Sequence, residues 1–339
     1  MAKKVIFEKK NVLVAGGAGF IGSHLCDELV GKAKVICVDN FLSGSERNID
    51  HLLSNPDFVF INHDINSPID LASLPELKKF KVQFQGIQEI YNLSCPTSPR
   101  HFSENRLSTL DVNSTGVKNL LDLAVFYEAK FLQFSSSVVY GLRDEKNPNL
   151  QVQENYLGLV DQLSVRSSYD EGKRFSESLV QNYRDVYNID AKIIRVFRTY
   201  GPRMPLDDDQ MIPDFINSAL DGKDLVIYGE ESFASSFCYV SDVVDASLKV
   251  MDNGFFGPYN VGSDVDSSFR RIAEIIITET NSESQIRFED EKLFMTELIL
   301  PDIRKIRNEL NWMPVVTLEN GLKKTIFDLQ AQKRLQKFQ

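Results

Sequence analysis

Asn11-Val-Leu-Val-Ala-Gly-Gly-Ala-Gly-Phe-Ile-Gly22 is the stretch of sequence that decides the fold. The apolar residues 12–14 predict a short buried strand, and residues 21–29 place apolar side chains at helical intervals. Between these two elements glycine recurs at every third position, as Gly16, Gly19 and Gly22. A strand, a glycine turn and a helix N-terminus form a cradle for a pyrophosphate, because the backbone can approach the phosphates and the first-turn N–H groups face them.

A second predicted strand ends in the acid that such a cradle uses. Residues 34–38 are mostly apolar and lead to Asp39, which follows the glycines by about 20 residues. A carboxylate at this place accepts hydrogen bonds from the adenosine ribose hydroxyls, and it repels a 2′-phosphate. The sequence therefore predicts NAD rather than NADP. A glycine triplet alone is a weak signal, since ordinary βα turns also contain glycine, but the second strand and its acid favour the dinucleotide.

Composition and charge argue against several classes of partner. The 339 residues carry a net charge of −10, which argues against nucleic acid or an anionic membrane as a general partner. No apolar run approaches the roughly 18 residues of a membrane span, and we expect no signal peptide and a cytoplasmic protein. The four cysteines form no Cys-x-x-Cys pair, and Cys26 and Cys37 lie in apolar segments, which predicts buried free thiols. Scattered histidines and the solvated character of the acidic run 207–209 predict no metal site.

Strand-like and helix-like segments alternate through the first half of the chain. The predicted strands lie at 58–62, 89–94, 131–136 and 191–197, and the predicted helices at 112–129 and 169–186. This alternation predicts an α/β fold with a Rossmann-like, doubly wound parallel sheet. We expect residues 1–200 to form the NAD-binding domain, with 229–262 returning to it. Residues 201–228 and 263–339, where the elements become shorter, are then expected to form a smaller C-terminal α/β lobe for the substrate.

Three side chains could carry out redox chemistry beside a nicotinamide. Tyr169 and Lys173 stand four residues apart at the start of a predicted helix, so they share one of its faces. A phenol with a pKa of about 10 is a poor base at neutral pH, and a nearby ammonium is expected to lower the pKa of Tyr169. Ser136, at the end of the preceding predicted strand, can hydrogen-bond a substrate hydroxyl. Together these groups could support hydride removal from carbon while Tyr169 takes the proton.

The chain resembles the extended short-chain dehydrogenase/reductases, the NAD-dependent epimerases and dehydratases, over essentially its whole length. Besides the glycine loop and Asp39, the motifs that carry the resemblance lie at 63–65, 92–99, 135–141, 169–174, 195–204 and 237–242. Among the nucleotide-sugar members it is most similar to the UDP-glucuronate decarboxylases, or UDP-xylose synthases. The proline-rich run 95–99 and the Tyr-Asp-Glu-Gly-Lys-Arg, Tyr-Gly-Pro-Arg-Met and Phe-Cys-Tyr-Val-Ser-Asp segments are the features typical of that group.

The resemblance implies roles for individual residues. The implied catalytic residues are Ser136, Tyr169 and Lys173. NAD would be bound by Tyr169 and Lys173 together with Gly16, Gly19, Phe20, Ile21, Gly22, Asp39, Asn40, Asp64, Ile65 and Leu93. A nucleotide sugar, a UDP-sugar above all, would be bound by Pro96, Ser137, Arg198, Arg203 and Tyr228. The resemblance also implies a homodimer in which the helices at 112–129 and 169–186 pair with a second copy, through contacts that include Phe126, Tyr127 and Tyr183.

The chain departs from the family pattern at four positions. Val138 stands where the family has a glutamate, Ile299 and Ser235 where it has arginines, and Arg198 where it has an asparagine. We expect Arg198 to replace part of the diphosphate binding lost at Ser235. A 4,6-dehydratase must remove the C5 proton with a positioned acid/base, which Val138 does not provide, so the sequence argues against that activity.

Two fates of a sugar oxidised at C4 stay open. A 4-keto glucuronate is a β-keto acid, which loses carbon dioxide without a base. Decarboxylation is therefore still possible without the glutamate. A 4-epimerase needs only reversible oxidation and rotation of the keto sugar, which suits an apolar residue at 138. We therefore expect an enzyme that oxidises a nucleotide sugar at C4 with tightly held NAD, most similar to UDP-glucuronate decarboxylase. The alternatives are a nucleotide-sugar 4-epimerase and, from another class, a catalytically silent NAD-binding regulatory protein.

Overall fold

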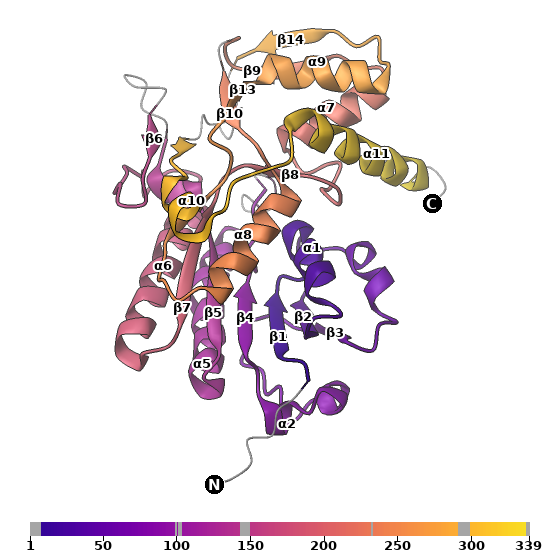
Figure 1. The fold of residues 1–339 in the computed structure, drawn as a ribbon. Helices are drawn as coiled ribbons and strands as arrows, with labels where there is room; N and C mark the ends of the chain where they lie inside the picture. The colour runs from indigo at the N-terminus through magenta and orange to yellow at the C-terminus, as the bar shows by residue number, and fades with distance from the viewer. Residues whose placement is uncertain are drawn as a thin grey trace.

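A parallel sheet forms the centre of the larger part of the molecule (Figure 1). The computed structural model describes residues 8–98, 100, 104–142, 150–231, 233–290 and 299–336. Within these ranges the sheet has seven strands in the order β12-β7-β5-β4-β1-β2-β3, and every neighbouring pair is parallel. The strands are β1 (Asn11–Ala15), β2 (Lys34–Asp39), β3 (Phe58–Asn62), β4 (Glu89–Asn92), β5 (Lys130–Ser136), β7 (Ala191–Val196) and β12 (Tyr259–Val261). Since helices cover both faces, β1 is buried along its entire length, as its unbroken apolar run predicts.

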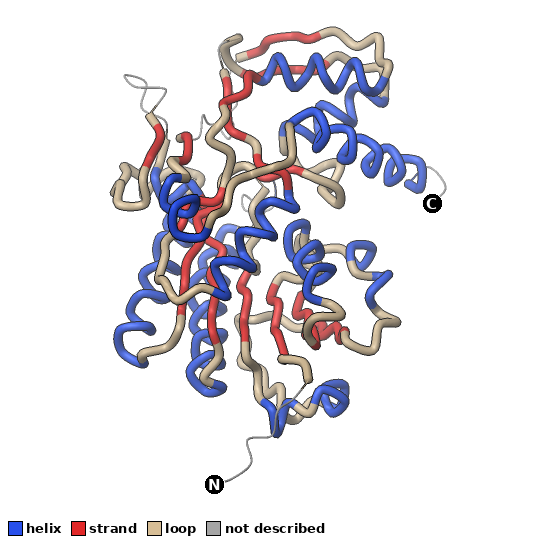
Figure 2. The backbone as a smooth tube through the Cα atoms, in the orientation of Figure 1, coloured by secondary structure: helices blue, strands red, loops and turns tan. Residues whose placement is uncertain are grey.

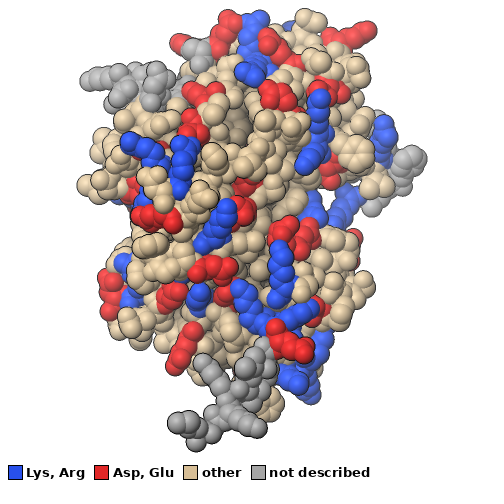
Figure 3. Space-filling model, viewed as in Figure 1, with Lys and Arg blue, Asp and Glu red and all other residues tan. Residues whose placement is uncertain are grey.

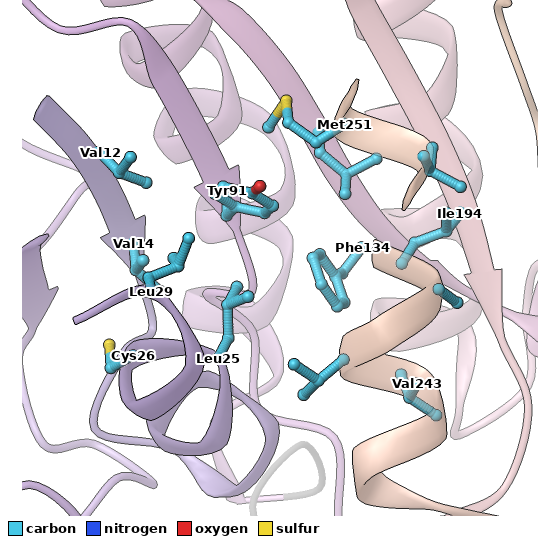
Figure 4. Close-up of a cluster of buried hydrophobic side chains, with 14 of the residues drawn as sticks. Val12, Val14, Leu25, Cys26, Leu29, Tyr91, Phe134, Ile194, Val243 and Met251 are labelled. Carbon is cyan, nitrogen blue, oxygen red and sulfur yellow. The ribbon is translucent and has the colours of Figure 1, made fainter. Parts of the chain in front are cut away.

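Helices lie on both sides of this sheet (Figure 2). α1 (Phe20–Leu29) and α8 (Val240–Asp252) cover one face, where Leu25, Phe134 and Val243 belong to one apolar cluster (Figure 4). α5 (Val117–Tyr127) and α6 (Ser167–Tyr187) cover the other face, and their apolar side chains pack on the same strands. The prediction of a doubly wound parallel sheet is therefore confirmed.

The strand order reverses between β1 and β4. From β1 the chain builds outward through β2 to β3, and it then crosses to the other side of β1 to form β4 and β5. The loops that follow β1 and β4 consequently diverge at the carboxyl edge of the sheet. This divergence opens a crevice, which is where open α/β sheets bind their ligands.

A smaller group of elements lies beyond the carboxyl ends of the sheet strands (Figure 1). Its helices are α7 (Met211–Leu220), α9 (Phe269–Thr280) and α11 (Leu318–Gln336), and these three helices contact one another. They share an apolar core with the strand β9 (Leu225–Tyr228), which pairs in parallel with β14 (Ile286–Glu289). The chain thus builds a second core over the crevice.

Short elements complete the described part of the chain. The short strands are β6 (Gln151–Val152), β8 (Thr199–Tyr200), β10 (Ala234–Ser236), β11 (Cys238–Tyr239), β13 (Asp266–Ser268) and β15 (Leu300–Pro301), which pair two by two. The remaining helices are α2 (Val82–Gln85), α4 (Arg106–Asp111) and α10 (Arg304–Leu310), with 3-10 turns at Glu46–Asn48, Asp50–Leu52, Pro75–Phe80 and Ser137–Tyr140.

The helix predicted for 112–129 differs from the observed one. A π-helical turn, Val112–Gly116, precedes α5, and the helix ends at Tyr127 because Glu128 adopts a left-handed conformation with φ of 54°. Within the π-turn, the Ser114 hydroxyl and the Asn113 amide both donate to backbone carbonyls of the preceding turn. Such side-chain bonds compete with the helical hydrogen-bond pattern and widen it locally.

The surface carries charges of both signs. On the face drawn in Figure 3, acidic and basic side chains are interspersed rather than gathered by sign. None of the helices in the described ranges is both long enough and apolar enough to cross a membrane. All four cysteines are free thiols, and Cys26 and Cys37 are buried, which confirms the prediction for that pair.

Candidate active site

A cavity of about 840 Å³ occupies the crevice between the sheet and the smaller group of elements. All of the predicted catalytic and cofactor-binding residues line it, and so do Pro96, Ser137, Arg198 and Arg203. Tyr228, the last residue of β9, does not line it. Pro99, the last residue of the predicted proline-rich run, lies outside the described residues. The cavity therefore gathers side chains from segments nearly 200 positions apart in the sequence, because Gly16 and Arg203 both line it.

The glycine loop is compact because its backbone approaches neighbouring backbone too closely for a Cβ at two of the glycines. Gly16 has φ of +77°, and a Cβ there would lie 2.8 Å from the Leu93 carbonyl carbon. A Cβ on Gly22 would lie only 2.1 Å from the Gly16 oxygen, so α1 could not pack so closely against the loop. A Cβ on Gly19 would meet the Gly16 oxygen at 3.2 Å and nothing else within 4 Å. Gly16 and Gly22 thus shape the loop, whereas Gly19 leaves space at the N-terminus of α1.

Asp39 lies beside this loop at the end of β2. Its carboxylate accepts hydrogen bonds from the backbone N–H groups of Ala18 at 3.0 Å and Phe41 at 2.8 Å. Burial raises the pKa of Asp39, and these backbone hydrogen bonds oppose the rise. Each carboxylate oxygen retains a second lone pair, which can accept a ribose hydroxyl. The glycine cradle and this acid therefore fit the pyrophosphate and the adenosine ribose of NAD.

The three predicted catalytic residues lie together where β5 meets α6. Tyr169 and Ser136 are hydrogen-bonded through their side chains. The Lys173 ammonium donates to the Phe134 carbonyl oxygen at 2.9 Å and lies 5.9 Å from the centre of the Tyr169 ring. Burial raises the pKa of Tyr169, while the Ser136 hydrogen bond opposes the rise. The net shift is therefore upward rather than downward as expected, because desolvation of the phenol outweighs the groups that favour its charged form.

Apolar and thiol groups surround Tyr169. Val138 is buried, packs against Tyr169, and has Cys95 as a further neighbour. The Asn113 amide in the π-turn donates to the Cys95 sulfur at 3.1 Å, and its Oδ1 is buried with no partner among the described residues. Sequence reasoning missed Cys95 and Asn113. A signal was present only for Cys95, which directly follows a predicted strand at the carboxyl edge of the sheet.

Arg203 has a partner that the sequence did not predict. Its guanidinium lies 2.7 Å from the Asp27 carboxylate of α1, and its backbone N–H donates to Asp328 of α11 at 2.7 Å. Arg203 therefore links the glycine-loop helix to the smaller group of elements while also lining the cavity. Arg198 lies over the Phe269 ring, 5.8 Å from its centre, and Arg166 pairs with Asp170 at 3.4 Å.

Two of the departures from the family pattern do not line the cavity. Ile299 is buried in an apolar cluster with Val139, Tyr140 and Phe197. Ser235 is buried in β10, whose partner is β13. Val138 and Arg198, by contrast, line the cavity. Among the described residues no group of three or more His, Cys, Asp or Glu side chains is placed to hold a metal ion.

The fold and the site define an enzyme that binds a dinucleotide and presents a serine, a tyrosine and a lysine to its substrate. Residues 12–262 match the model of the NAD dependent epimerase/dehydratase family. UDP-glucuronic acid decarboxylase 1 of Arabidopsis thaliana is 36% identical over 324 residues, which are 95% of this chain and 70% of that protein. The chain therefore belongs to the NAD dependent epimerase/dehydratase family, and NAD is its cofactor.

Solved structures agree with this family. The UDP-N-acetylglucosamine 4-epimerase of Methanobrevibacter ruminantium M1, in complex with UDP-N-acetylmuramic acid, is 26% identical with a TM-score of 0.84, and covers 96% of this chain and 100% of its own. The UDP-glucuronic acid 4-epimerase of Bacillus cereus, in complex with UDP-glucuronic acid and NAD, is 25% identical with a TM-score of 0.81, and covers 95% of this chain and 99% of its own.

Proposed function

We propose that this enzyme oxidises a UDP-sugar at C4 and then reduces a keto intermediate, with the same NAD held throughout. The observation that carries the proposal is the hydrogen-bonded pair of Ser136 and Tyr169 in the cavity that also contains the glycine cradle. The two oxygens of this pair can bracket one substrate hydroxyl. We also propose that residues 1–200 with 229–262 bind the cofactor, and that 201–228 with 263–339 bind the nucleotide sugar.

Each of the three catalytic side chains has a separate role in the proposed oxidation. Tyr169 removes the proton of the C4 hydroxyl as the hydride leaves C4, and it returns a proton when the ketone is reduced. The Ser136 hydroxyl hydrogen-bonds the same sugar oxygen and holds it in line with the phenol. Lys173 stabilises the tyrosinate by its charge, and the Phe134 carbonyl fixes the position of that ammonium. Bound NAD supplies the hydride acceptor and, after oxidation of the sugar, the hydride donor.

UDP-glucuronate is the substrate we propose first, with a UDP-pentose and carbon dioxide as products. The support is the 36% identity to a UDP-glucuronic acid decarboxylase over 95% of the chain. Oxidation at C4 makes the C6 carboxylate β to a ketone, and carbon dioxide then leaves without a protein base. The enolate that remains takes up a proton at C5, and the resulting 4-keto pentose is then reduced at C4. With Val138 and Ile299 the chain lacks the glutamate and the arginine of the family pattern. These groups would assist decarboxylation, but cleavage of the carbon–carbon bond requires neither of them.

A nucleotide-sugar 4-epimerase is the second candidate, and Val138 is the observation that favours it. The valine packs against Tyr169 and lines the cavity, so it presents an apolar surface beside the phenol. A keto sugar can rotate against an apolar surface, and no acid or base at this position promotes a different reaction of the ketone. In this case the carbon count of the sugar stays unchanged.

Proton NMR of the purified enzyme with UDP-glucuronate, UDP-glucose and UDP-N-acetylglucosamine, each in turn, distinguishes the candidates. A UDP-pentose formed from UDP-glucuronate supports decarboxylation. A C4 epimer with an unchanged carbon count supports the epimerase. If all three sugars stay unchanged while NAD remains bound, the proposal of C4 oxidation fails for these sugars, and a silent NAD-binding protein becomes the better explanation.

We propose a homodimer formed through α5 and α6. Apolar side chains on this side of the molecule are exposed, among them Phe126 of α5 at 75% and Val186 of α6 at 72%. Two of the predicted contacts have partners within their own chain, since Tyr127 packs beside Gly86 and Tyr183 donates to Asp122. Light scattering should give twice the chain mass, and Phe126→Asp should give the monomer mass. The free thiols support a reducing compartment, and we propose the cytoplasm.

A further inference from the structure

β5 and α6 are joined by a row of hydrogen bonds that runs alongside the catalytic residues. Four successive residues of β5 take part, and each bonds to a different residue of α6. The pairs are Gln133 with Ser176, the Phe134 carbonyl with Lys173, Ser135 with Glu177, and Ser136 with Tyr169. Two of these four pairs contain all three predicted catalytic side chains. The relative placement of Ser136, Tyr169 and Lys173 is therefore set by how β5 and α6 align.

Glu177 is the member of this row that is also fixed from a third element. Its Oε1 accepts from the Ser135 hydroxyl at 2.6 Å and from Arg195 Nε at 2.9 Å. Its Oε2 accepts from Arg195 Nη2 at 2.7 Å, so the arginine of β7 binds the carboxylate in bidentate fashion. The side chains of Glu177 and Arg195 are both 13% exposed, which limits screening of this pair by water. One carboxylate thus joins β5, α6 and β7.

Arg195 extends the connection toward the turn that follows Ser136. Its Nη1 donates to the Tyr140 hydroxyl at 2.8 Å and to the Glu154 carbonyl at 2.8 Å. Its guanidinium also lies over the Tyr140 ring, 4.7 Å from the centre. Tyr140 ends the 3-10 turn that begins at Ser137 and donates to Asn260 at 2.6 Å. The turn that carries Val138 is therefore held at its far end by the same arginine that holds Glu177.

We propose that Glu177 is a positioning residue for C4 oxidation: its carboxylate, clamped by Arg195, bonds Ser135 and thereby keeps Ser136 aligned with Tyr169. Glu177 lies eight positions after Tyr169 and four after Lys173, so all three residues lie along the same face of α6. Loss of the Ser135 bond lets β5 shift along α6, and Ser136 moves with it. This inference rests on the proposed function only for its kinetic readout.

The test uses three variants that separate the bond to Ser135 from the charge of Glu177. Glu177→Gln weakens both the Ser135 bond and the Arg195 pair. Glu177→Asp keeps the charge, but its shorter side chain does not span Ser135 and Arg195 together. Ser135→Ala removes only the hydroxyl. Glu171→Gln is the matched control, because Glu171 pairs with Arg174 at 3.8 Å on a more exposed part of the same helix.

The main readout is the single-turnover rate of substrate oxidation, followed by the absorbance of reduced NAD. We expect Glu177→Gln to slow this rate by roughly 10- to 100-fold, the scale of a displacement near 1 Å at a reacting group. KM and the bound NAD content should stay within about twofold of the wild type, because Glu177 does not line the cavity. Glu177→Asp and Ser135→Ala should slow the rate in the same direction, and Glu171→Gln should not.

A double-mutant cycle distinguishes positioning from a purely structural role. If Glu177 acts through Ser135, the variant carrying both Glu177→Gln and Ser135→Ala should be no slower than Glu177→Gln alone. Multiplied effects, or a folded Glu177→Gln with a wild-type rate, would overturn the proposal. If Glu177→Gln does not fold, Ser135→Ala and Glu177→Asp carry the same test.

If the wild type oxidises none of the sugars, crystal structures of the wild type and of Ser135→Ala test the positioning role through the distance between the Ser136 and Tyr169 side chains. The proposed function would then have failed, but Ser135→Ala would still be expected to lengthen the Ser136–Tyr169 contact beyond hydrogen-bond distance. An unchanged contact in that variant overturns the positioning role, whatever the wild type does with sugars.

Discussion

Gly22→Ala tests whether the glycine loop is shaped by close backbone packing. Gly22 lies in the first turn of α1, and a Cβ there would lie 2.1 Å from the Gly16 oxygen and 2.9 Å from the Cα of Gly17. Both contacts are with backbone, which cannot rotate away as a flexible side chain can. The loop or the helix must therefore move by about 1.4 Å to restore ordinary contact, since van der Waals contacts lie near 3.5 Å.

The expected loss of stability is the balance of two opposing effects. Overpacking costs typically 1–3 kcal/mol, and we take about 3 because the contact is with backbone. Alanine in place of glycine in a helix returns about 1 kcal/mol. The net loss is about 2 kcal/mol, and with an unfolding entropy of about 2.1 cal/mol/K per residue over 339 residues it lowers Tm by about 3 °C.

Differential scanning calorimetry and NAD titration separate loop shape from phosphate access. Gly254→Ala is the control for stability, because a Cβ there meets nothing within 4 Å. Gly19→Ala is the control for access: its Cβ is nearly free of the protein, so Tm should hold while NAD affinity falls roughly 10- to 100-fold, or about 1.4–2.8 kcal/mol. A Gly22→Ala protein with both the Tm and the NAD affinity of the wild type would refute the packing argument.

Three further outcomes are expected. Burial lowers the pKa of His24, so the unfolded chain takes up its proton first; stability should fall as the pH drops below about 6.5, and His24→Gln should flatten that fall in a pH series of melting curves. Burial raises the pKa of Asp39, so NAD affinity should begin to fall at a higher pH than for an ordinary aspartate, whereas Asp39→Asn should bind about 10- to 100-fold more weakly with no such dependence in the same pH range. Val138→Glu restores the carboxylate of the family pattern against Tyr169 and should raise the pKa of that phenol further, so the pH at which single-turnover oxidation reaches half its maximum should move upward, whereas Val138→Ile should leave this pH profile close to that of the wild type.

Much of the larger core could be predicted from the sequence because its signals are local. The apolar runs of β1 and β2, the spacing of Gly16, Gly19 and Gly22, and the acid at Asp39 are each contained in a few residues. Helices such as α6 have an apolar stripe that a single stretch of sequence reveals. Parallel sheets are then expected from the alternation, since each βαβ unit has a preferred handedness.

The rest depends on contacts between distant residues, which no local pattern records. The Asp27 carboxylate that pairs with Arg203 lies 176 positions before it, and nothing around either residue indicates the pair. The raised pKa of Tyr169 depends on its burial beside Val138 and Cys95, which come from two other segments. The π-turn at Val112–Gly116 is decided by side-chain bonds that compete with a helix of otherwise ordinary sequence.

Oxidation at C4 and the fate of the keto sugar depend on different parts of this site. Ser136, Tyr169 and Lys173 are held by the hydrogen-bonded row between β5 and α6. Val138 lies on the turn after β5, and a change of its side chain leaves each bond of that row in place. A family that keeps the row and varies the turn can therefore keep one oxidation while it changes the fate of the ketone. For this chain the intact row argues for turnover. Because Val138 supplies no acid or base, the group at C6 of the sugar decides the product. A 6-carboxylate is lost as carbon dioxide, whereas a keto sugar with a neutral C6 group can only rotate and take back the hydride at C4.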